Sequence, residues 1–163
     1  MLHGGTGTAH LRIESRSPLV ETPMAAATPA PAIDPPSVIL ILDADAGAAQ
    51  VTRAGVERAV AGASVTVVAT PEAAWSSAHR RPPHVLIIDP TPAELASVWL
   101  IENIKVAYPG IHIIVLASGP TRSLRRNGHR SAVDVFLDKP VPLPILVQAV
   151  RTALRDDIRP TPG

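Results

Sequence analysis

The residues of this chain that could do chemistry together stand at the ends of short apolar runs. Asp43 and Asp45 follow the run VILIL, Asp89 follows VLII, Ser118 follows IIVLA and Lys139 follows VFLD. A carboxylate can attack a phosphoryl group to give an acyl phosphate. Gathered carboxylates can hold Mg²⁺, while a lysine and a hydroxyl can bind further phosphoryl oxygens. These residue types fit a phosphoryl-binding pocket, provided that the fold brings them together.

The apolar runs predict the strands that would position these residues. They cover 37–42, 64–69, 84–88, 111–117 and 133–137, and each is nearly continuous in Val, Ile and Leu. Continuous apolar runs are typical of strands covered on both faces, as in parallel sheets. Because helix-like segments separate them, we expect a doubly wound, flavodoxin-like α/β fold with five parallel strands in the order 2-1-3-4-5. In such a sheet the ligand site lies at the carboxyl ends of the strands, where Asp43, Asp45 and Asp89 would converge and Lys139 would close the cluster.

Five helices are expected between and after these strands. Thr70-Pro71-Glu72 begins the second, and Thr91 with Glu94 forms a capping box that begins the third. The fourth, over 121–126, has the weakest pattern. The expected apolar positions are Val51, Val56 and Val60 in the first helix (47–61); Leu95, Val98, Ile101 (or Trp99) and Ile104 in the third; and Ile145, Leu146, Ala149, Val150 and Leu154 in the last, which begins near Leu143.

The composition divides the chain into a tail and one folded domain. The length of 163 residues favours a single domain. Residues 1–36 are rich in Ala and Pro, so we expect them to be disordered, and residues 156–163 to form a flexible C-terminal tail. Residues 37–155 hold nearly all the Val, Ile and Leu and form the domain. Met24 could begin a shorter product, although a simple tail is the favoured interpretation.

Charge and composition exclude several classes of protein. The formal net charge is +1, so nothing global suggests a nucleic-acid or membrane surface. The absence of cysteine excludes disulfides and thiol catalysis, and the apolar runs are too short to span a bilayer. We therefore expect a soluble cytoplasmic protein.

Over nearly all of residues 37–155 the sequence resembles the receiver domains of bacterial two-component response regulators. The pieces that carry the resemblance, in order and spacing, are VILILD (38–43), PHVLIID (83–89), IIVL (113–116) and FLDKP (136–140). The resemblance implies that Asp89 is the phosphoacceptor, Asp43 an acid of the metal pocket and Lys139 the phosphate-sensing lysine. It also places Phe136 at the switch aromatic position, and the family's bond between this lysine and the following proline is commonly cis.

The sequence departs from the family at two of these strand ends. Ala44 stands where the family has a second acid, and Asp45 comes one place later. The family's Ser or Thr after strand four falls on Ala117, with Ser118 one place late. Because Mg²⁺ demands strict octahedral geometry, we expect Mg²⁺ binding to be weak or absent. We favour Asp45 as a helix cap over Asp45 as a metal ligand.

Three functions are compatible with these residues. The first is a single-domain response regulator that takes a phosphoryl group on Asp89 from a histidine kinase or phosphotransfer protein. The second is a pseudo-receiver, a protein-binding module that no longer depends on phosphate. The third is a small phosphatase or hydrolase using Asp89, which is least favoured because no second catalytic acid is visible; we therefore expect a signalling protein rather than an enzyme.

A downstream protein partner is expected because no effector domain is visible after residue 155. The predicted partner surface comprises helix four, strand five and helix five, where basic residues gather in an otherwise neutral protein. These residues are Arg122, Arg125, Arg126 and Arg130. A solvated basic face with no partner is the alternative.

Overall fold

The computed structural model of the chain describes residues 36–119, 124 and 132–157, in which strands and helices alternate along the chain. The elements are β1 (Val38–Leu42), α1 (Ala46–Ala59), β2 (Ser64–Val68), α2 (Pro71–Arg80), β3 (Val85–Ile88), α3 (Glu94–Ala107), β4 (His112–Ala117), β5 (Val135–Asp138) and α5 (Leu143–Asp157). All five strands are parallel, in the order β2-β1-β3-β4-β5. The fold class and strand order expected from the sequence are therefore confirmed.

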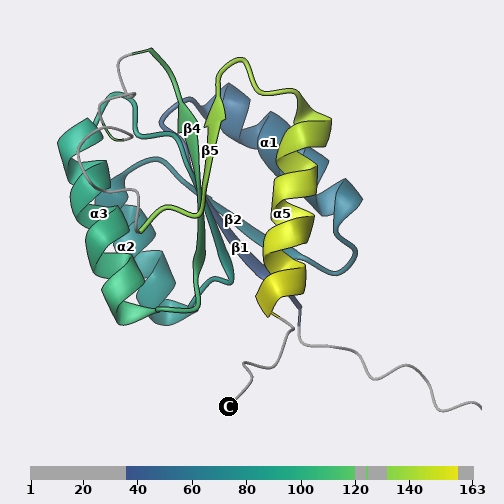
Figure 1. Cartoon of the computed structure of the whole chain (residues 1–163), viewed down its shortest axis with the longest axis horizontal. Helices are drawn as coiled ribbons and strands as arrows, with labels where there is room; N and C mark the ends of the chain where they lie inside the picture. The colour runs from purple at the N-terminus through teal and green to yellow at the C-terminus, as the bar shows by residue number, and fades with distance from the viewer. Residues whose placement is uncertain (1–35, 120–123, 125–131, 158–163) are drawn as a thin grey trace, which may run out of the picture. The chain divides into compact units, whose positions relative to one another are not determined.

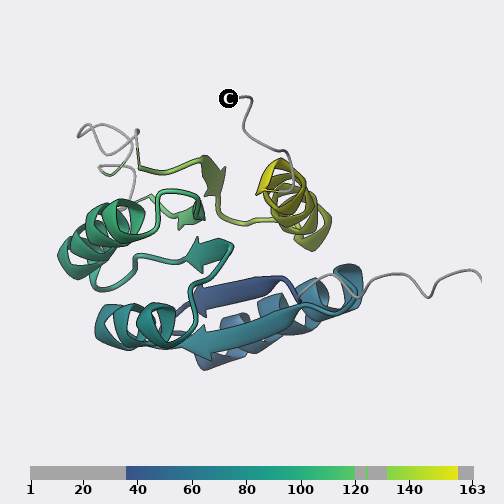
Figure 2. The same ribbon diagram turned by 90° about the horizontal axis from the view of Figure 1, so that it is seen from below.

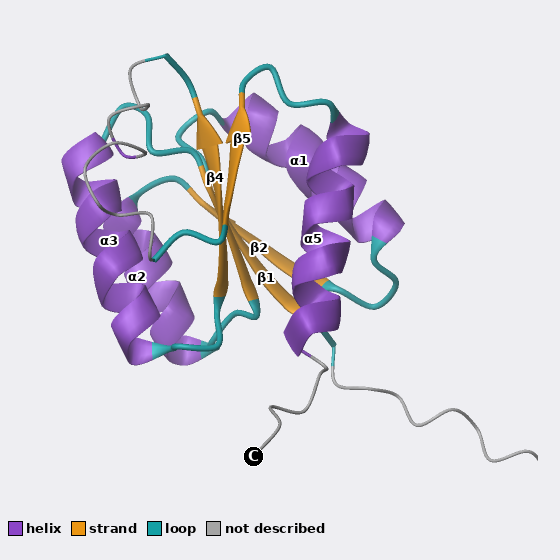
Figure 3. Ribbon diagram, viewed as in Figure 1, coloured by secondary structure: helices purple, strands orange, loops and turns teal. Residues whose placement is uncertain are grey.

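Helices cover both faces of the sheet. Figures 1 and 3 show α2 and α3 on one side of the strands and α1 and α5 on the other. The view from below gives the same arrangement, with the strands between the two helix pairs (Figure 2). This double cover explains why the strands are apolar along their whole length rather than at alternate positions.

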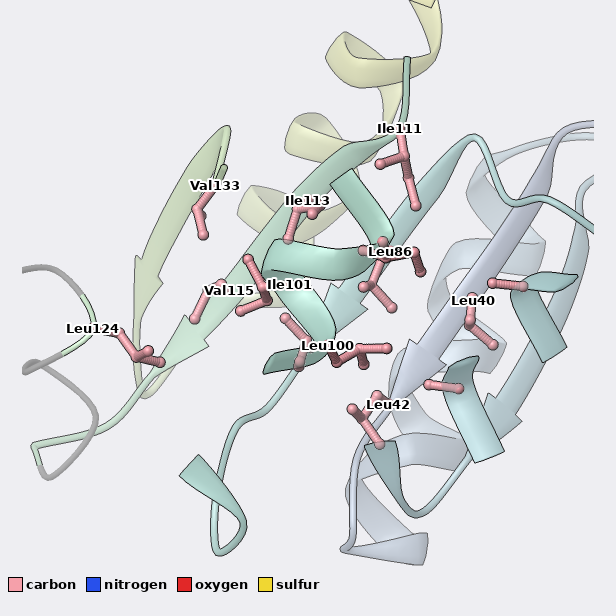
Figure 4. Packing of buried hydrophobic residues seen from close by; sticks show 14 residues of the cluster. Leu40, Leu42, Leu86, Leu100, Ile101, Ile111, Ile113, Val115, Leu124 and Val133 are labelled. Carbon is pink, nitrogen blue, oxygen red and sulfur yellow. The ribbon is translucent and has the colours of Figure 1, made fainter. Parts of the chain in front are cut away.

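Successive residues of each central strand enter opposite cores. The core under α2 and α3 takes the strand residues Leu40, Leu42, Leu86, Ile88, Ile113 and Val115 (Figure 4). The core under α1 and α5 takes Ile39, Ile41, Val85, Ile87, Ile114 and Leu116. The period of two along a strand thus divides one apolar run between two cores.

Two of the predicted helix starts are confirmed and one is wrong. The Thr70 hydroxyl accepts a hydrogen bond from the Ala73 amide (3.2 Å) at the start of α2, and Asp45 caps α1. The third helix begins at Glu94 with no side-chain cap, so Thr91 is not the expected cap. The Thr91 amide instead donates to Asp89 Oδ1 (2.9 Å), which places Thr91 in the loop beside that carboxylate.

The predicted apolar face of α3 is partly wrong. Leu95 is 87% exposed, and Trp99 is also exposed, while the buried residues are Ser97, Leu100, Ile101 and Ile104. At 100° per residue, Leu95 lies on the far side of the helix from Ser97 and Leu100. Val51 in α1 and Ile145 in α5 are likewise exposed. A serine within the buried stripe concealed the true face of α3 from the sequence pattern.

The ends of the domain differ slightly from expectation. Helix α5 continues to Asp157, two residues past the predicted end of the domain. Residues 1–35 of the predicted N-terminal tail lie outside the described residues. Residues 158–163 of the predicted C-terminal tail also lie outside them. The predicted fourth helix also lies outside them except for Leu124, which is helical and buried against the α2/α3-side core.

Candidate functional site

Two aspartates meet at the carboxyl ends of adjacent central strands. Asp43 directly follows β1 and Asp89 directly follows β3, and the register of this parallel pair aligns Leu42 with Ile88. The Asp89 amide donates to the Leu42 carbonyl (2.9 Å), and the Asp43 amide donates to the Val68 carbonyl of β2 (3.1 Å). Backbone bonds to neighbouring strands therefore fix both aspartates at the point where strand order reverses.

Asp89 is buried and held by two donors. Its side chain is 8% exposed. Oδ1 accepts a hydrogen bond from the Thr91 amide, and Oδ2 pairs with Nζ of Lys139. Lys139 follows β5, and its amide donates to the Ala117 carbonyl at the end of β4 (2.8 Å). Three strand ends thus bring a buried carboxylate and a lysine into contact, as the sequence predicted.

Asp43 is buried beside Asp89, and these surroundings disfavour its negative charge. The residue is 5% exposed, and its Oδ1 accepts a hydrogen bond from the Asp45 amide (2.9 Å). Burial raises the pKa of Asp43 above its usual value, and the negative charge of Asp89 raises it further. The Asp45 amide and the Lys139 ammonium act in the opposite direction without cancelling the rise.

We expect Asp43→Asn to stabilise the domain at neutral pH, because it removes a buried charge whose ionisation folding disfavours. The folded protein binds the Asp43 proton more tightly than the unfolded chain, so ionisation of Asp43 opposes folding at neutral pH. The advantage of the variant should shrink as the pH falls toward 3.8, the ordinary value for this group. Urea unfolding of both proteins in a chelator, from neutral to acid pH, measures this difference. A difference independent of pH would contradict the assignment.

Asp45 serves as the cap that was favoured from the sequence. Its Oδ1 accepts a hydrogen bond from the Ala48 amide (3.0 Å) in the first turn of α1. Ala44, between the two aspartates, contributes only a methyl group at this strand end. Among the described residues, no three His, Asp or Glu side chains form a group that could hold a metal ion.

Two hydroxyls lie close together at the loop that follows Asp89. Thr91 Oγ1 and Ser118 Oγ are 3.4 Å apart, so Ser118 contacts the loop that follows β3. Sequence reasoning placed Ser118 near this pocket but assigned Thr91 to a helix cap. The signal for Thr91 was its position two residues after Asp89, since that spacing lets a backbone amide reach the preceding Asp carboxylate.

Phe136 lies on β5, partly buried against the α2/α3-side core. Both Lys139-Pro140 and Thr91-Pro92 are cis peptide bonds. The basic residues predicted for the partner surface, Arg122, Arg125, Arg126 and Arg130, lie outside the described residues.

Comparison with solved structures identifies the fold. A response regulator receiver domain from Clostridium thermocellum superposes with a TM-score of 0.66 at 19% identity, covering 74% of this chain and 95% of that one. A CheY-like receiver domain protein from Methanospirillum hungatei JF-1 superposes with a TM-score of 0.64 at 21% identity, covering 75% of this chain and 96% of that one. A response regulator from Thermotoga maritima superposes with a TM-score of 0.63 at 18% identity, covering 74% of this chain and 98% of that one. This chain has the receiver-domain fold.

The likeness to receiver domains is one of structure. A scan against protein-family models gives no match, and a search of curated proteins gives none either. Asp43, Asp89 and Lys139 stand at the carboxyl ends of their strands, which is where an open, doubly wound parallel sheet places a ligand site. Within the described part of this receiver fold, no helix is long and apolar enough to cross a membrane.

Proposed function

We propose that this domain is a receiver-type signalling module in which Asp89 accepts a phosphoryl group from a histidine kinase or phosphotransfer protein. The observation that carries the proposal is the contact between Lys139 Nζ and the buried Asp89 carboxylate, beside a second buried carboxylate, that of Asp43. A structural ion pair alone would not require a second buried carboxylate beside it, because that carboxylate opposes folding.

The chemistry assigned to the pocket is a single phosphoryl transfer. A carboxylate oxygen of Asp89 attacks the phosphorus of a phosphohistidine, a P–O bond forms, and the P–N bond to the imidazole breaks. The freed imidazole takes up a proton, and Asp89 becomes an acyl phosphate. Lys139, already paired with Asp89, remains beside the added negative charge and stabilises it. The output would pass to a downstream protein partner.

The donor set fits a weak Mg²⁺ site. Asp43 and Asp89 are buried, adjacent and mutually repelling, which is an arrangement that a divalent cation relieves. These two carboxylates would hold the ion, which would neutralise phosphoryl charge when bound. Asp45 is engaged at the helix cap and Ala44 offers no ligand, so the two carboxylates carry the site alone.

A phosphorylation-independent pseudo-receiver is the second candidate. It is favoured by Ala44 and by the engagement of Asp45 with α1 rather than with the pocket. Such a module would keep the fold and its binding surface while its affinity for a partner would not depend on Asp89.

Intact-protein mass measurement after incubation with Mg²⁺ and acetyl phosphate tests the proposal. A gain of one phosphoryl group, reversed by incubation without donor, is the expected result. If wild type gains no mass from acetyl phosphate or from a phosphorylated phosphotransfer protein, the pseudo-receiver replaces the first candidate.

Restoring a carboxylate should strengthen Mg²⁺ binding. We expect Ala44→Asp to increase Mg²⁺ affinity several-fold, because a third carboxylate joins Asp43 and Asp89. Asp45→Ala should leave Mg²⁺ affinity nearly unchanged, while costing about 1 kcal/mol of stability through loss of the cap. Calorimetric titration with Mg²⁺ and urea unfolding measure the two effects. Tight wild-type binding that Asp45→Ala abolishes would make Asp45 a ligand instead.

A further inference from the structure

Ser97 is a buried polar residue that the proposed chemistry does not use. It is 1% exposed, and it lies on the face of α3 that packs against the sheet. Its backbone amide donates to the Ala93 carbonyl (2.9 Å) within the helix. Within the described parts of the chain its hydroxyl makes no hydrogen bond. Buried hydroxyls in proteins nearly always have a partner, either a protein group or an ordered water.

The Ser97 side chain borders a small cavity beside Asp89. The cavity has a volume of about 20 Å³, and its polar side chains are Asp89, Thr91 and Ser97. The rest of its wall is apolar, formed by Leu42, Ala44, Ala69, Pro71, Pro90, Pro92 and Ala93. Ala44 contributes to this wall, so a methyl group bounds part of the space next to Asp89.

The geometry points to a one-water site in this cavity, where a bound water joins the Ser97 hydroxyl to the Asp89 carboxylate. The volume suits one water and is too small for a larger ligand. A carboxylate only accepts hydrogen bonds, whereas a serine hydroxyl both donates and accepts. A water can therefore donate to Asp89 while it bonds with Ser97, and Thr91 offers a third partner.

The site makes Ser97 a positioning residue for Asp89. Thr91 and Lys139 already hold the two oxygens of this carboxylate, and the water adds a link to the rigid helix α3. The inference of a water site is based on the cavity and on the buried Ser97 hydroxyl. The effect of that water on phosphorylation rests on the proposed function. For that step we expect Ser97→Ala to slow phosphorylation by acetyl phosphate roughly two- to tenfold, the scale of one hydrogen bond.

High-resolution crystal structures and carboxyl ¹³C spectra of the unphosphorylated, full-length protein test the site directly. Wild type should show one ordered water within hydrogen-bonding distance of Ser97 Oγ and an Asp89 oxygen. Ser97→Ala should lose this water and shift the Asp89 carboxyl signal. The matched control Ser76→Ala, at an exposed position of α2, should change neither. Ser97→Cys, whose thiol is larger than the hydroxyl and bonds weakly, replaces Ser97→Ala if that variant does not fold.

The outcomes separate this inference from the proposed function. A water that persists unchanged in Ser97→Ala would overturn the site, as would a wild-type structure in which the Ser97 hydroxyl bonds to a helix carbonyl and no water is present. Neither result depends on phosphoryl transfer. Absence of phosphorylation in wild type, with the water present, would overturn only the proposed function.

Discussion

Asp89→Asn is expected to abolish the mass gain from acetyl phosphate. An amide is not a nucleophile toward phosphorus, and it also removes the charge that pairs with Lys139. The expected change is from stoichiometric labelling to none, as measured by intact mass in Mg²⁺. The fold should survive, because Asn retains an oxygen that can accept the Thr91 amide.

Asp138→Asn is the matched control for this prediction. Asp138 also ends a strand and is adjacent in sequence to Lys139, but it is exposed and lies on β5 rather than β3. Its replacement should leave labelling unchanged. Labelling that survives Asp89→Asn, or that is lost in Asp138→Asn, would place the phosphoacceptor elsewhere.

Leu100→Ala is expected to destabilise the domain by about 2–5 kcal/mol. Leu100 is fully buried and lies with Ile101 and Ile104 in the core between α3 and the sheet (Figure 4). Removing its three terminal carbon atoms leaves a cavity that a close-packed core cannot fill. Urea unfolding followed by circular dichroism measures the loss.

Leu95→Ala provides the matched comparison within the same helix. Leu95 is exposed, so the same chemical change should alter stability by less than about 0.5 kcal/mol. Helix propensity barely distinguishes Leu from Ala, so burial alone accounts for the expected contrast. Equal losses in the two variants would show that both residues are buried under the conditions of the experiment.

The sequence predicts the sheet better than the helix faces, for a physical reason. A strand covered on both faces is apolar at every position, so its existence can be read without knowing which residue faces which core. Once the strand order is predicted, the carboxyl ends of those strands place Asp43, Asp89 and Lys139 together. Predicting the contact between Lys139 and Asp89 therefore required only the strand order.

The face of α3 could not be read in this way. This helix is apolar around much of its circumference, and Ser97 interrupts the stripe that packs against the sheet. Leu95 and Leu100 have the same hydrophobicity, so it is their packing in the folded protein that distinguishes the exposed residue from the buried one. The Thr91 capping box failed similarly, because the Asp89 carboxylate is a competing partner for the Thr91 amide that local sequence rules do not weigh.

The ion pair between Lys139 and Asp89 joins a central, fully buried strand of the sheet to an edge strand. β3 has a neighbour on each side and is buried throughout, whereas β5 pairs only with β4 and is partly exposed. If Asp89 is phosphorylated as proposed, the added charge would displace β5 more readily than β3, because β5 is held by one neighbouring strand and β3 by two. The shift would then fall at the edge of the sheet, on the strand that carries Phe136.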